Sequence, residues 1–188
     1  VEGTAITGAV KFFVEDPNGN LLYFASTTKK YSITGTSGPT EVAAGGAVTI
    51  TDMVNAGAKM YACLGTGTVA RSKTWATGTW ANETVKMQTA AWVNGTLYWA
   101  QGETSGGVAY KLAWTGSSIT VGKETTPITS IAECQNVVVI FKTDGMYMLT
   151  EGTTPKARLI MGFRPIMANN GVATAVYNGA LYFGMGDG

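Results

Sequence analysis

Histidine is absent from this 188-residue chain, cysteine occurs only twice, and charged residues make up only 13% of it. The absence of histidine excludes Ser-His-Asp and Cys-His nucleophile systems and most zinc sites. A net charge of +1 gives no long-range field that would gather nucleic acid or an anionic membrane. No apolar run approaches the about 18 residues that a membrane span requires. We therefore expect neither nucleic-acid binding nor a membrane span.

Glycine is abundant, with 25 residues, and 45% of the chain is hydrophobic. A short unit recurs in which a turn is followed by an apolar strand, and residues 94–101, NGTLYWAQ, show it most clearly. The apolar residues that open these strands are Leu22, Met60, Leu97, Val138 and Leu181. A spacing of roughly 40 residues with several short strands in each unit is typical of the four-stranded blades of a β-propeller.

The repeats indicate one all-β domain, residues 1–188, with about four and a half blades visible. The expected repeats cover residues 8–46, 47–84, 85–126 and 127–170, and residues 171–188 form a partial fifth. Each blade must stack on its neighbours, because it cannot bury both faces alone. Five blades could close into a ring if residues 8–16 completed the last blade. The spacing from Leu181 through the two termini to Leu22 would then be shorter than the spacing between the other repeats. We therefore favour a fragment of a larger ring over a closed ring of five.

Two early segments carry opposite signals. Residues 35–46 are rich in Gly, Ser, Thr and Pro, and we expect a loop there. Residues 47–53, AVTITDM, alternate with a period of two at Val48 and Ile50, which predicts a strand. Further along, the apolar run at residues 137–142, VVVIFK, also predicts a strand.

Aromatic residues recur in register on the second strand of the units. A repeat position filled by large side chains is typical of the core between blades, which pack face to face. The positions that we assign to this core are Tyr23, Tyr61, Tyr98, Trp99, Val139 and Tyr182. A ring of sugar-stacking aromatics, one in each blade, is the alternative interpretation of the same pattern.

Three tryptophans lie outside that register, at Trp75, Trp80 and Trp114. They are the candidates for an exposed patch that contacts a ligand. Exposed tryptophans beside Asn, Asp or Gln on several blades would indicate that the ligand is a glycan. The second function hypothesis is therefore a carbohydrate-binding or host-receptor-binding propeller.

Most of the 12 carboxylates stand beside Gly, Thr, Asn or Pro, where solvated turn residues belong. A propeller glycoside hydrolase would need two of them facing each other across a central pocket, and this is the least favoured hypothesis. Cys63 and Cys134 occupy different positions in repeats that are not adjacent. We expect two buried thiols rather than a disulfide or a metal site. No catalysis, cofactor or metal is expected.

A family resemblance rests mainly on the fourth repeat. It reads ITS at residues 128–130 and QNVVVIFKTDGMYML at residues 135–149, and residues 94–101 and 178–184 carry its Asn-Gly and Leu-Tyr-aromatic part. This text resembles the repeat of β-propeller domains in tailed-bacteriophage virion proteins, such as tail nozzle, tail-tube and baseplate components. The resemblance implies a structural, protein-binding module of the phage tail. Its partners would be other virion subunits and further copies of the chain, and its location would be the virion.

Overall fold

The computed structural model describes residues 10–15, 21–25, 30–33, 40–42, 50–65, 68–74, 80–101, 109–150, 154–162 and 174–184. Side chains are described at Val14 and, within these ranges, from residue 50 onward. Every helix or strand assigned in this part of the chain is a β-strand, and the strands run from β1 to β18. The same residues contain no helix that is long and apolar enough to cross a membrane. The all-β prediction is confirmed.

Four antiparallel four-stranded sheets and one hairpin follow one another along the chain, and we call them blades 1 to 5. Blade 1 contains β1 (Val10–Glu15), β2 (Leu21–Ala25), β3 (Lys30–Ile33) and β4 (Thr40–Val42). Blade 2 contains β5 (Asp52–Ala56), β6 (Lys59–Cys63), β7 (Arg71–Thr74) and β8 (Ala81–Asn82). Blade 3 contains β9 (Thr89–Val93), β10 (Thr96–Ala100), β11 (Lys111–Trp114) and β12 (Ser117–Thr120).

Blade 4 contains β13 (Ile128–Cys134), β14 (Val137–Lys142), β15 (Gly145–Thr150) and β16 (Lys156–Gly162). Blade 5 contains only β17 (Thr174–Tyr177) and β18 (Ala180–Phe183) among the described residues. The predicted architecture, four four-stranded blades and part of a fifth, is confirmed.

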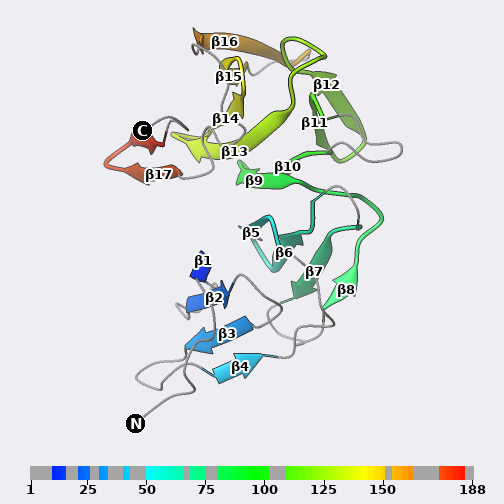
Figure 1. The fold of residues 1–188 in the computed structure, drawn as a ribbon, viewed down its shortest axis with the longest axis vertical. Coiled ribbons are helices and arrows are strands. Elements are labelled where there is room, and N and C mark those ends of the chain that lie inside the picture. The colour runs from blue at the N-terminus through cyan, green and yellow to red at the C-terminus, as the bar shows by residue number, and fades with distance from the viewer. Residues whose placement is uncertain are drawn as a thin grey trace.

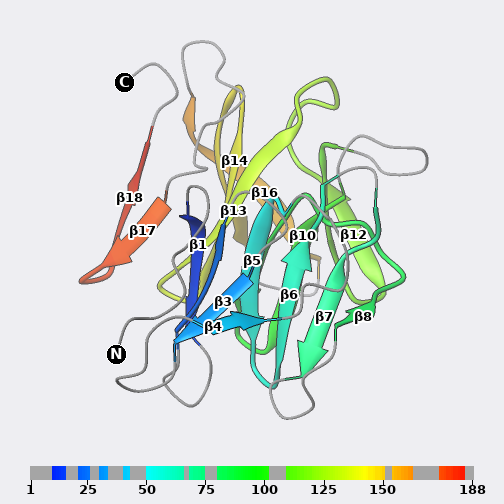
Figure 2. The same cartoon turned by 60° about the horizontal axis from the view of Figure 1, so that its bottom comes forward.

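The first strands of successive blades adjoin in chain order, with β1 beside β5, β5 beside β9, β9 beside β13 and β13 beside β17 (Figure 1). The remaining strands of each blade follow side by side, as β5 to β8 show in Figure 2. Within the described strands, no comparable contact joins β17 back to β1. The described blades therefore form an open arc rather than a closed ring.

The hairpins that join the first two strands of blades 2 to 5 have a left-handed first turn residue. Gly57, Asn94, Gln135 and Asn178 occupy this place, with φ values from 47° to 64°. Two-residue turns with positive φ match the right-handed twist of the flanking strands. Glycine and asparagine reach this conformation at little cost, which explains the turn pairs that recur in the sequence.

Alternation along the second strand of each blade decides which neighbour a side chain touches. In β10, Leu97 and Trp99 pack against blade 2, whereas Tyr98 packs against blade 4. Tyr61 and Val139 take the place of Tyr98 in their own blades and also face the blade that follows. Because successive side chains of a strand point to opposite faces, the predicted core positions fall on both faces of the blades.

Two expectations for the early strands were wrong. The strand expected at residues 47–53 is β5, which begins only at Asp52, and residues 47–49 lie outside the described part. Pairing with β6 fixes β5, from Ala56 opposite Lys59 to Asp52 opposite Cys63. The loop expected at residues 35–46 contains the outer strand β4, which pairs with β3. A strand of three residues is too short to show a period, so only its pairing defines it.

Candidate functional site

A cavity of about 310 Å³ lies between the first strands of blades 2 to 5. Its polar lining includes Asp52, Ser130, Glu133 and Thr174, and Trp92 supplies an aromatic wall. We call it the central cavity. Its size falls at the lower end of the range for small-molecule sites. Whether its two carboxylates, Asp52 and Glu133, are free or hydrogen-bonded decides which chemistry the cavity can support.

Asp52 links neighbouring blades at one level of the central cavity. Its Oδ2 accepts hydrogen bonds from Thr89 Oγ1 at 2.5 Å and from the Ala90 amide at 3.1 Å, and its Oδ1 accepts the Met53 amide at 2.7 Å. Thr89 Oγ1 in turn accepts the Ile131 amide at 3.3 Å. We call Asp52, Thr89 and Ile131 the inner bridge. It connects blades 2, 3 and 4, which belong to separate hydrogen-bonded sheets.

The surroundings of Asp52 disfavour its charged form and that of its neighbour Cys63. Burial raises the pKa of Asp52, and the hydrogen bonds from Thr89, Ala90 and Met53 oppose this rise. Cys63 lies opposite Asp52 in the β5–β6 pair. Burial, and then the nearby Asp52 carboxylate, raise the pKa of the Cys63 thiol well above its ordinary value. A buried thiol that stays protonated is a poor nucleophile.

The second carboxylate of the central cavity, Glu133, also holds the backbone. Its Oε1 accepts the Asn136 amide at 2.7 Å and so supports the turn between β13 and β14. A glycosidase pair needs one carboxyl group as a proton donor and the other as a base or nucleophile. Both carboxylates here already have structural hydrogen-bond partners. Within the described ranges, no group of three or more His, Cys, Asp or Glu side chains could hold a metal ion.

Side-chain amides link the hairpin turns of blades 3, 4 and 5. Asn94 Nδ2 donates to the carbonyl oxygen of Asn136 at 3.2 Å, and Gln135 Nε2 donates to that of Gly179 at 2.6 Å. In both cases the first turn residue of one blade donates to the second turn residue of the next. We call these two hydrogen bonds the turn relay.

A second cavity, of about 200 Å³, lies between blades 3 and 4 next to the turn relay. The Tyr98 side chain, the turn residues Asn94 and Asn136, and Thr150 and Pro155 contribute to its lining. We call it the outer cavity. An aromatic ring beside amide and hydroxyl groups offers both an apolar face and hydrogen-bonding partners, which suits a small polyhydroxylated ligand.

Lys142 is fully buried beneath the connection from blade 3 to blade 4. Its Nζ donates to the carbonyl oxygen of Val121 and, at 2.6 Å, to that of Lys123, and it lies 5.7 Å from the centre of the Tyr147 ring. Burial lowers the pKa of Lys142, and the nearby Asp144 carboxylate opposes this change. A buried ammonium group must be paired, so Lys142 holds this connection against blade 4.

The assigned core positions do not all lie in a core. Four of them lie at interfaces between described blades: Tyr61, Tyr98, Trp99 and Val139. Trp99 and Val139 are buried there, and the two tyrosines are half-buried. Tyr182 is 58% exposed, because no described blade follows blade 5. The side chain of Tyr23 lies outside the described residues.

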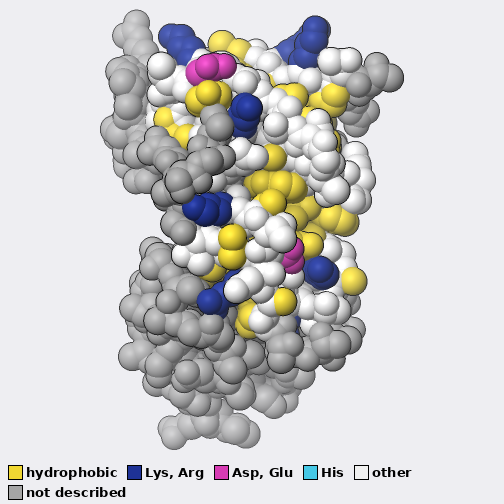
Figure 3. All heavy atoms as spheres, turned by 90° about the vertical axis from the view of Figure 1, so that its right-hand side faces the viewer, with side chains coloured by type: hydrophobic (Ala, Val, Ile, Leu, Met, Phe, Trp, Pro, Cys, Tyr) yellow, Lys and Arg dark blue, Asp and Glu magenta, His cyan; other side chains and the backbone are white. Residues whose placement is uncertain are grey.

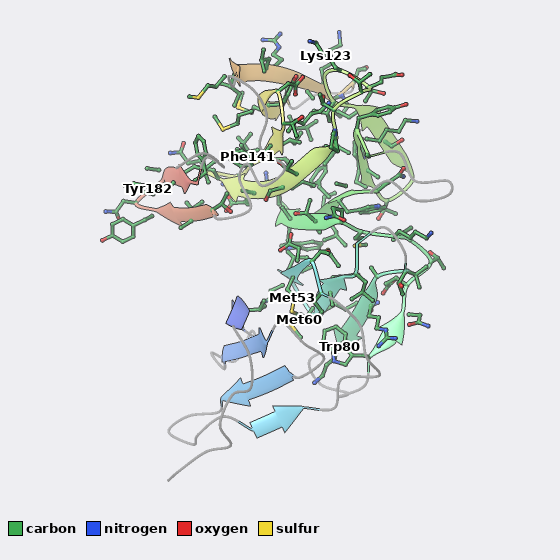
Figure 4. The ribbon with its side chains drawn as sticks, in the orientation of Figure 1. Met53, Met60, Trp80, Lys123, Phe141 and Tyr182 are labelled. Carbon is green, nitrogen blue, oxygen red and sulfur yellow. The ribbon has the colours of Figure 1, made fainter. Side chains whose placement is uncertain are left out.

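The tryptophans expected to contact a ligand do not come together. Trp80 is half-buried and packs beside Met53 and Met60 at the interface between blades 1 and 2 (Figure 4). Trp114 is half-buried against the core between blades 2 and 3. Trp75 lies outside the described residues. The expected exposure is not found at Trp80 or Trp114, and a ligand-binding role for any of the three stays a prediction.

Cys63 and Cys134 are both free, so the prediction that no disulfide joins them is confirmed. Cys63 is buried as expected, but Cys134 is only partly buried, and its Sγ lies 3.7 Å from the carbonyl oxygen of Gly179. The expectation of two buried thiols therefore holds for Cys63 alone.

Sequence reasoning missed the inner bridge, the turn relay and the buried Lys142. One signal was available for the inner bridge. Asp52, Thr89 and Ser130 are polar residues at the same distance before the hairpin turns of blades 2, 3 and 4, among mostly apolar neighbours. No comparable signal marks Lys142, because its partners lie about 20 residues earlier in the chain.

No family model matches this sequence, and no curated protein matches it. Solved structures do match the fold. The structure described as YCF48 bound to D1 peptide is 11% identical, with a TM-score of 0.58, and the match covers 84% of this chain and 55% of that one. The Swd1 β-propeller domain of Myceliophteria thermophila is 12% identical, with a TM-score of 0.62, and the match covers 93% of this chain and 60% of that one. The chain thus spans little more than half the length of these structures, and it shares the β-propeller fold with them.

Proposed function

We propose that this chain is a rigid, non-catalytic protein-binding scaffold and a structural component of a phage particle, within its tail. One observation carries the proposal, namely an apolar surface on the outermost strand of blade 4. Leu159, Ile160 and Met161 of β16 are 57%, 51% and 48% exposed, and we call them the rim patch. Large apolar side chains that remain exposed on the outermost strand of a sheet are typical of a surface that binds another protein.

The position of the rim patch also suits a protein partner. In the described sheet, β16 is an edge strand, so its outer backbone groups are open to pairing. An exposed apolar edge strand is a template for a strand of a partner, with side-chain contacts adding specificity. Lys156 and Arg158 precede the patch on the same strand and are compatible with an orienting, charged rim.

Rigidity between the blades supports a scaffold role. The inner bridge, the turn relay and the Lys142 ammonium all join structure contributed by neighbouring blades or their connection. The inner bridge also engages the carboxylate of Asp52, a polar group of the central cavity. A surface that keeps its shape loses less conformational freedom on binding, which favours tight assembly.

The assignment to a phage particle is supported by the resemblance of residues 128–149 to tail-protein propeller repeats and by the low charge of the chain. On the face shown in Figure 3, Lys and Arg side chains are scattered and form no stripe. This face therefore offers no basic footprint for nucleic acid. The YCF48 structure, which shares this fold, is bound to a peptide.

The test is to locate the chain in particles purified from its source. Cross-linking with a lysine-reactive reagent, followed by mass spectrometry, should join Lys156, beside the rim patch, to other structural proteins of the particle. Lys111 of β11, on another blade, serves as a control. The proposal is overturned if purified particles lack the chain, or if Lys156 forms no cross-link to another particle protein.

The outer cavity favours a second candidate, the carbohydrate-binding propeller, because Tyr98 stands there beside the Asn94 and Asn136 turn residues. The measurement is a glycan array probed with the wild-type chain and with Asn94→Ala. Binding that is lost in Asn94→Ala and kept in Thr115→Ala, an exposed turn variant of the same blade, would support this candidate. An array without any bound glycan would remove it.

A further inference from the structure

The central cavity carries acidic groups and no basic ones in its described lining. This lining comes from the first strands of blades 2 to 5, which follow one another in Figure 1. Its only charged side chains are those of Asp52 and Glu133. Most of the other lining residues are small and apolar, and Trp92 adds an aromatic ring. The field inside the cavity therefore favours a cation over an anion.

Trp92 and Glu133 lie at the same level of the cavity. Each precedes the first turn residue of its blade, Asn94 or Gln135, by two positions, and β9 adjoins β13. The Trp92 ring reaches the neighbouring turn of blade 2, because its Cζ2 lies 3.7 Å from the place that a Cβ at Gly57 would take. These turns are exposed, and Trp92 and Glu133 are half-buried. The two side chains thus line the mouth of the central cavity.

Glu133 keeps one carboxylate oxygen for a ligand. Its Oε1 accepts the Asn136 amide at 2.7 Å, whereas no described residue donates to its Oε2. A carboxylate oxygen binds an ammonium group through a charge-assisted hydrogen bond. The face of an indole ring attracts the same group through its π electrons. The mouth of the cavity therefore combines two groups that bind an organic cation.

Ser130 lies deeper in the cavity, and its hydroxyl group has no hydrogen-bond partner among the described residues. Ser130 is 7% exposed and lines the cavity. Thr89 has the same place in blade 3, but its hydroxyl is engaged in the inner bridge. A buried hydroxyl without a partner costs free energy, which a polar atom of a ligand would recover. Three positions separate Ser130 from Glu133, roughly 10 Å along an extended strand.

The deep end of the cavity suits a neutral polar group rather than a second charge. Asp52 lies at the level of Ser130, and it already accepts hydrogen bonds from Thr89, Ala90 and Met53. Burial raises the pKa of Asp52, so its charged form is disfavoured there. The Ser130 hydroxyl is therefore the available group at this level.

From this arrangement we infer that the central cavity binds a small linear amine with a neutral hydroxyl group at its other end. The ammonium group lies at the mouth, between the Glu133 carboxylate and the Trp92 ring. The aliphatic stem passes the small apolar side chains, and the hydroxyl group hydrogen-bonds with Ser130. A lysine side chain of a partner shares the ammonium group and the stem but lacks the hydroxyl group. The inference goes beyond the scaffold role and does not involve the rim patch, so either proposal can fail without the other.

The first experiment compares ligands on the wild-type 188-residue chain by isothermal titration calorimetry. Aminohexanol should bind with one molecule per chain. Hexanol, which lacks the ammonium group, should give no measurable binding. Hexylamine, which lacks the hydroxyl group, should bind about fivefold more weakly, the loss of one neutral hydrogen bond. Nα-acetyl-lysine amide, which carries a free lysine side chain, should bind no more tightly than hexylamine.

The second experiment tests the two ends of the site with variants. Glu133→Gln keeps an oxygen for the Asn136 amide but removes the charge, and it should weaken aminohexanol binding about tenfold or more. Ser130→Ala should weaken aminohexanol binding about fivefold and leave hexylamine binding unchanged. Glu124→Gln is the matched control, because Glu124 is an exposed acid outside the cavity, and it should bind like the wild type. Circular dichroism and urea midpoints establish that each variant is folded.

Four results would overturn the inference, and two of them need no variant. The first is a wild-type chain that gives no heat of binding with aminohexanol at millimolar concentration, or that binds hexanol equally well. The second is tighter binding of Nα-acetyl-lysine amide than of aminohexanol, since a lysine side chain of a partner would then be the ligand. The third is a folded Glu133→Gln variant that binds like the wild type. The fourth is a Ser130→Ala variant that weakens hexylamine as much as aminohexanol, because Ser130 would then act through the fold alone.

Discussion

Replacing Thr89 by valine removes the centre of the inner bridge while nearly preserving side-chain volume. Thr89 is 4% exposed and its hydroxyl has two roles, donating to Asp52 Oδ2 at 2.5 Å and accepting the Ile131 amide at 3.3 Å. In Thr89→Val the buried Ile131 amide loses its acceptor, and the Asp52 carboxylate loses its side-chain donor. The carboxylate still accepts hydrogen bonds from the backbone amides of Ala90 and Met53.

These two losses set the magnitude of the effect. A buried donor left without an acceptor costs about 1–3 kcal/mol, and a hydrogen bond to a charged group contributes about 1.5–3 kcal/mol. The added methyl group of valine offsets about 0.8 kcal/mol. We expect Thr89→Val to lower the free energy of unfolding by about 3 kcal/mol. For a chain of this length, that corresponds to a fall in Tm of about 6–12 °C.

The assay is urea unfolding followed by tryptophan fluorescence, with Thr89→Ser as the control. Serine keeps the hydroxyl and loses one methyl group, so it should cost only about 1 kcal/mol. Equal stability of Thr89→Val and the wild type would refute the reasoning, since the bridge would then contribute nothing. A Thr89→Ser variant as unstable as Thr89→Val would show that packing, rather than the hydroxyl, carries the effect.

The same variant makes a prediction about pH. The pKa of Asp52 is raised in the folded state, so the folded chain favours the protonated form relative to the unfolded chain. Its contribution to stability is therefore present below the unfolded pKa and is lost as pH rises through the folded pKa. The hydrogen bond from Thr89 opposes the rise in pKa. In Thr89→Val the pKa should rise further, and the loss of stability should move to higher pH in urea unfolding series.

Three other substitutions test separate contacts, and each is measured by urea unfolding. Gly122→Ala should cost more than about 2 kcal/mol, since its Cβ would overlap the buried Tyr147 ring, whereas Gly116→Ala, with open space, should cost only the about 1 kcal/mol of its positive φ. Equal effects would contradict the contact. Lys142→Met should cost about 1–3 kcal/mol, because two carbonyl groups lose a buried donor; an unchanged midpoint would show that the ammonium holds nothing. Val139→Ala should cost about 2 kcal/mol, the transfer of two buried methyl groups plus a small cavity; a change below about 0.5 kcal/mol would argue against its coverage by blade 5.

The second strands of the blades could be predicted well, because their signals are local. The apolar run at residues 137–142 is β14, and the turn pair at residues 94–95 is a hairpin turn with positive φ at both residues. Such strands combine strong turn chemistry with side chains that are buried on both faces. β4 and the start of β5 could not be predicted in this way, because pairing with a neighbouring strand defines them.

The polar contacts between blades could not be predicted from local sequence patterns, because their partners lie far apart in the chain. Asp52 meets Thr89 across 37 positions in the chain, and the Lys142 ammonium meets a carbonyl group 21 positions earlier. Neither contact leaves a periodicity in the sequence. Tyr182 shows the opposite case: its repeat position was assigned correctly by register, but its burial depends on a blade that the described residues do not include.

The most direct test of the scaffold role is the oxidation of Met161 by hydroxyl radicals, read by mass spectrometry. Met161 belongs to the rim patch and is 48% exposed, whereas Met87, at 2% exposed, is the buried reference. We predict that Met161 is oxidised readily in the isolated chain and protected in purified phage particles, while Met87 is protected in both. Equal oxidation of Met161 in the isolated chain and in the particles would contradict the account, because no partner would then cover the rim patch.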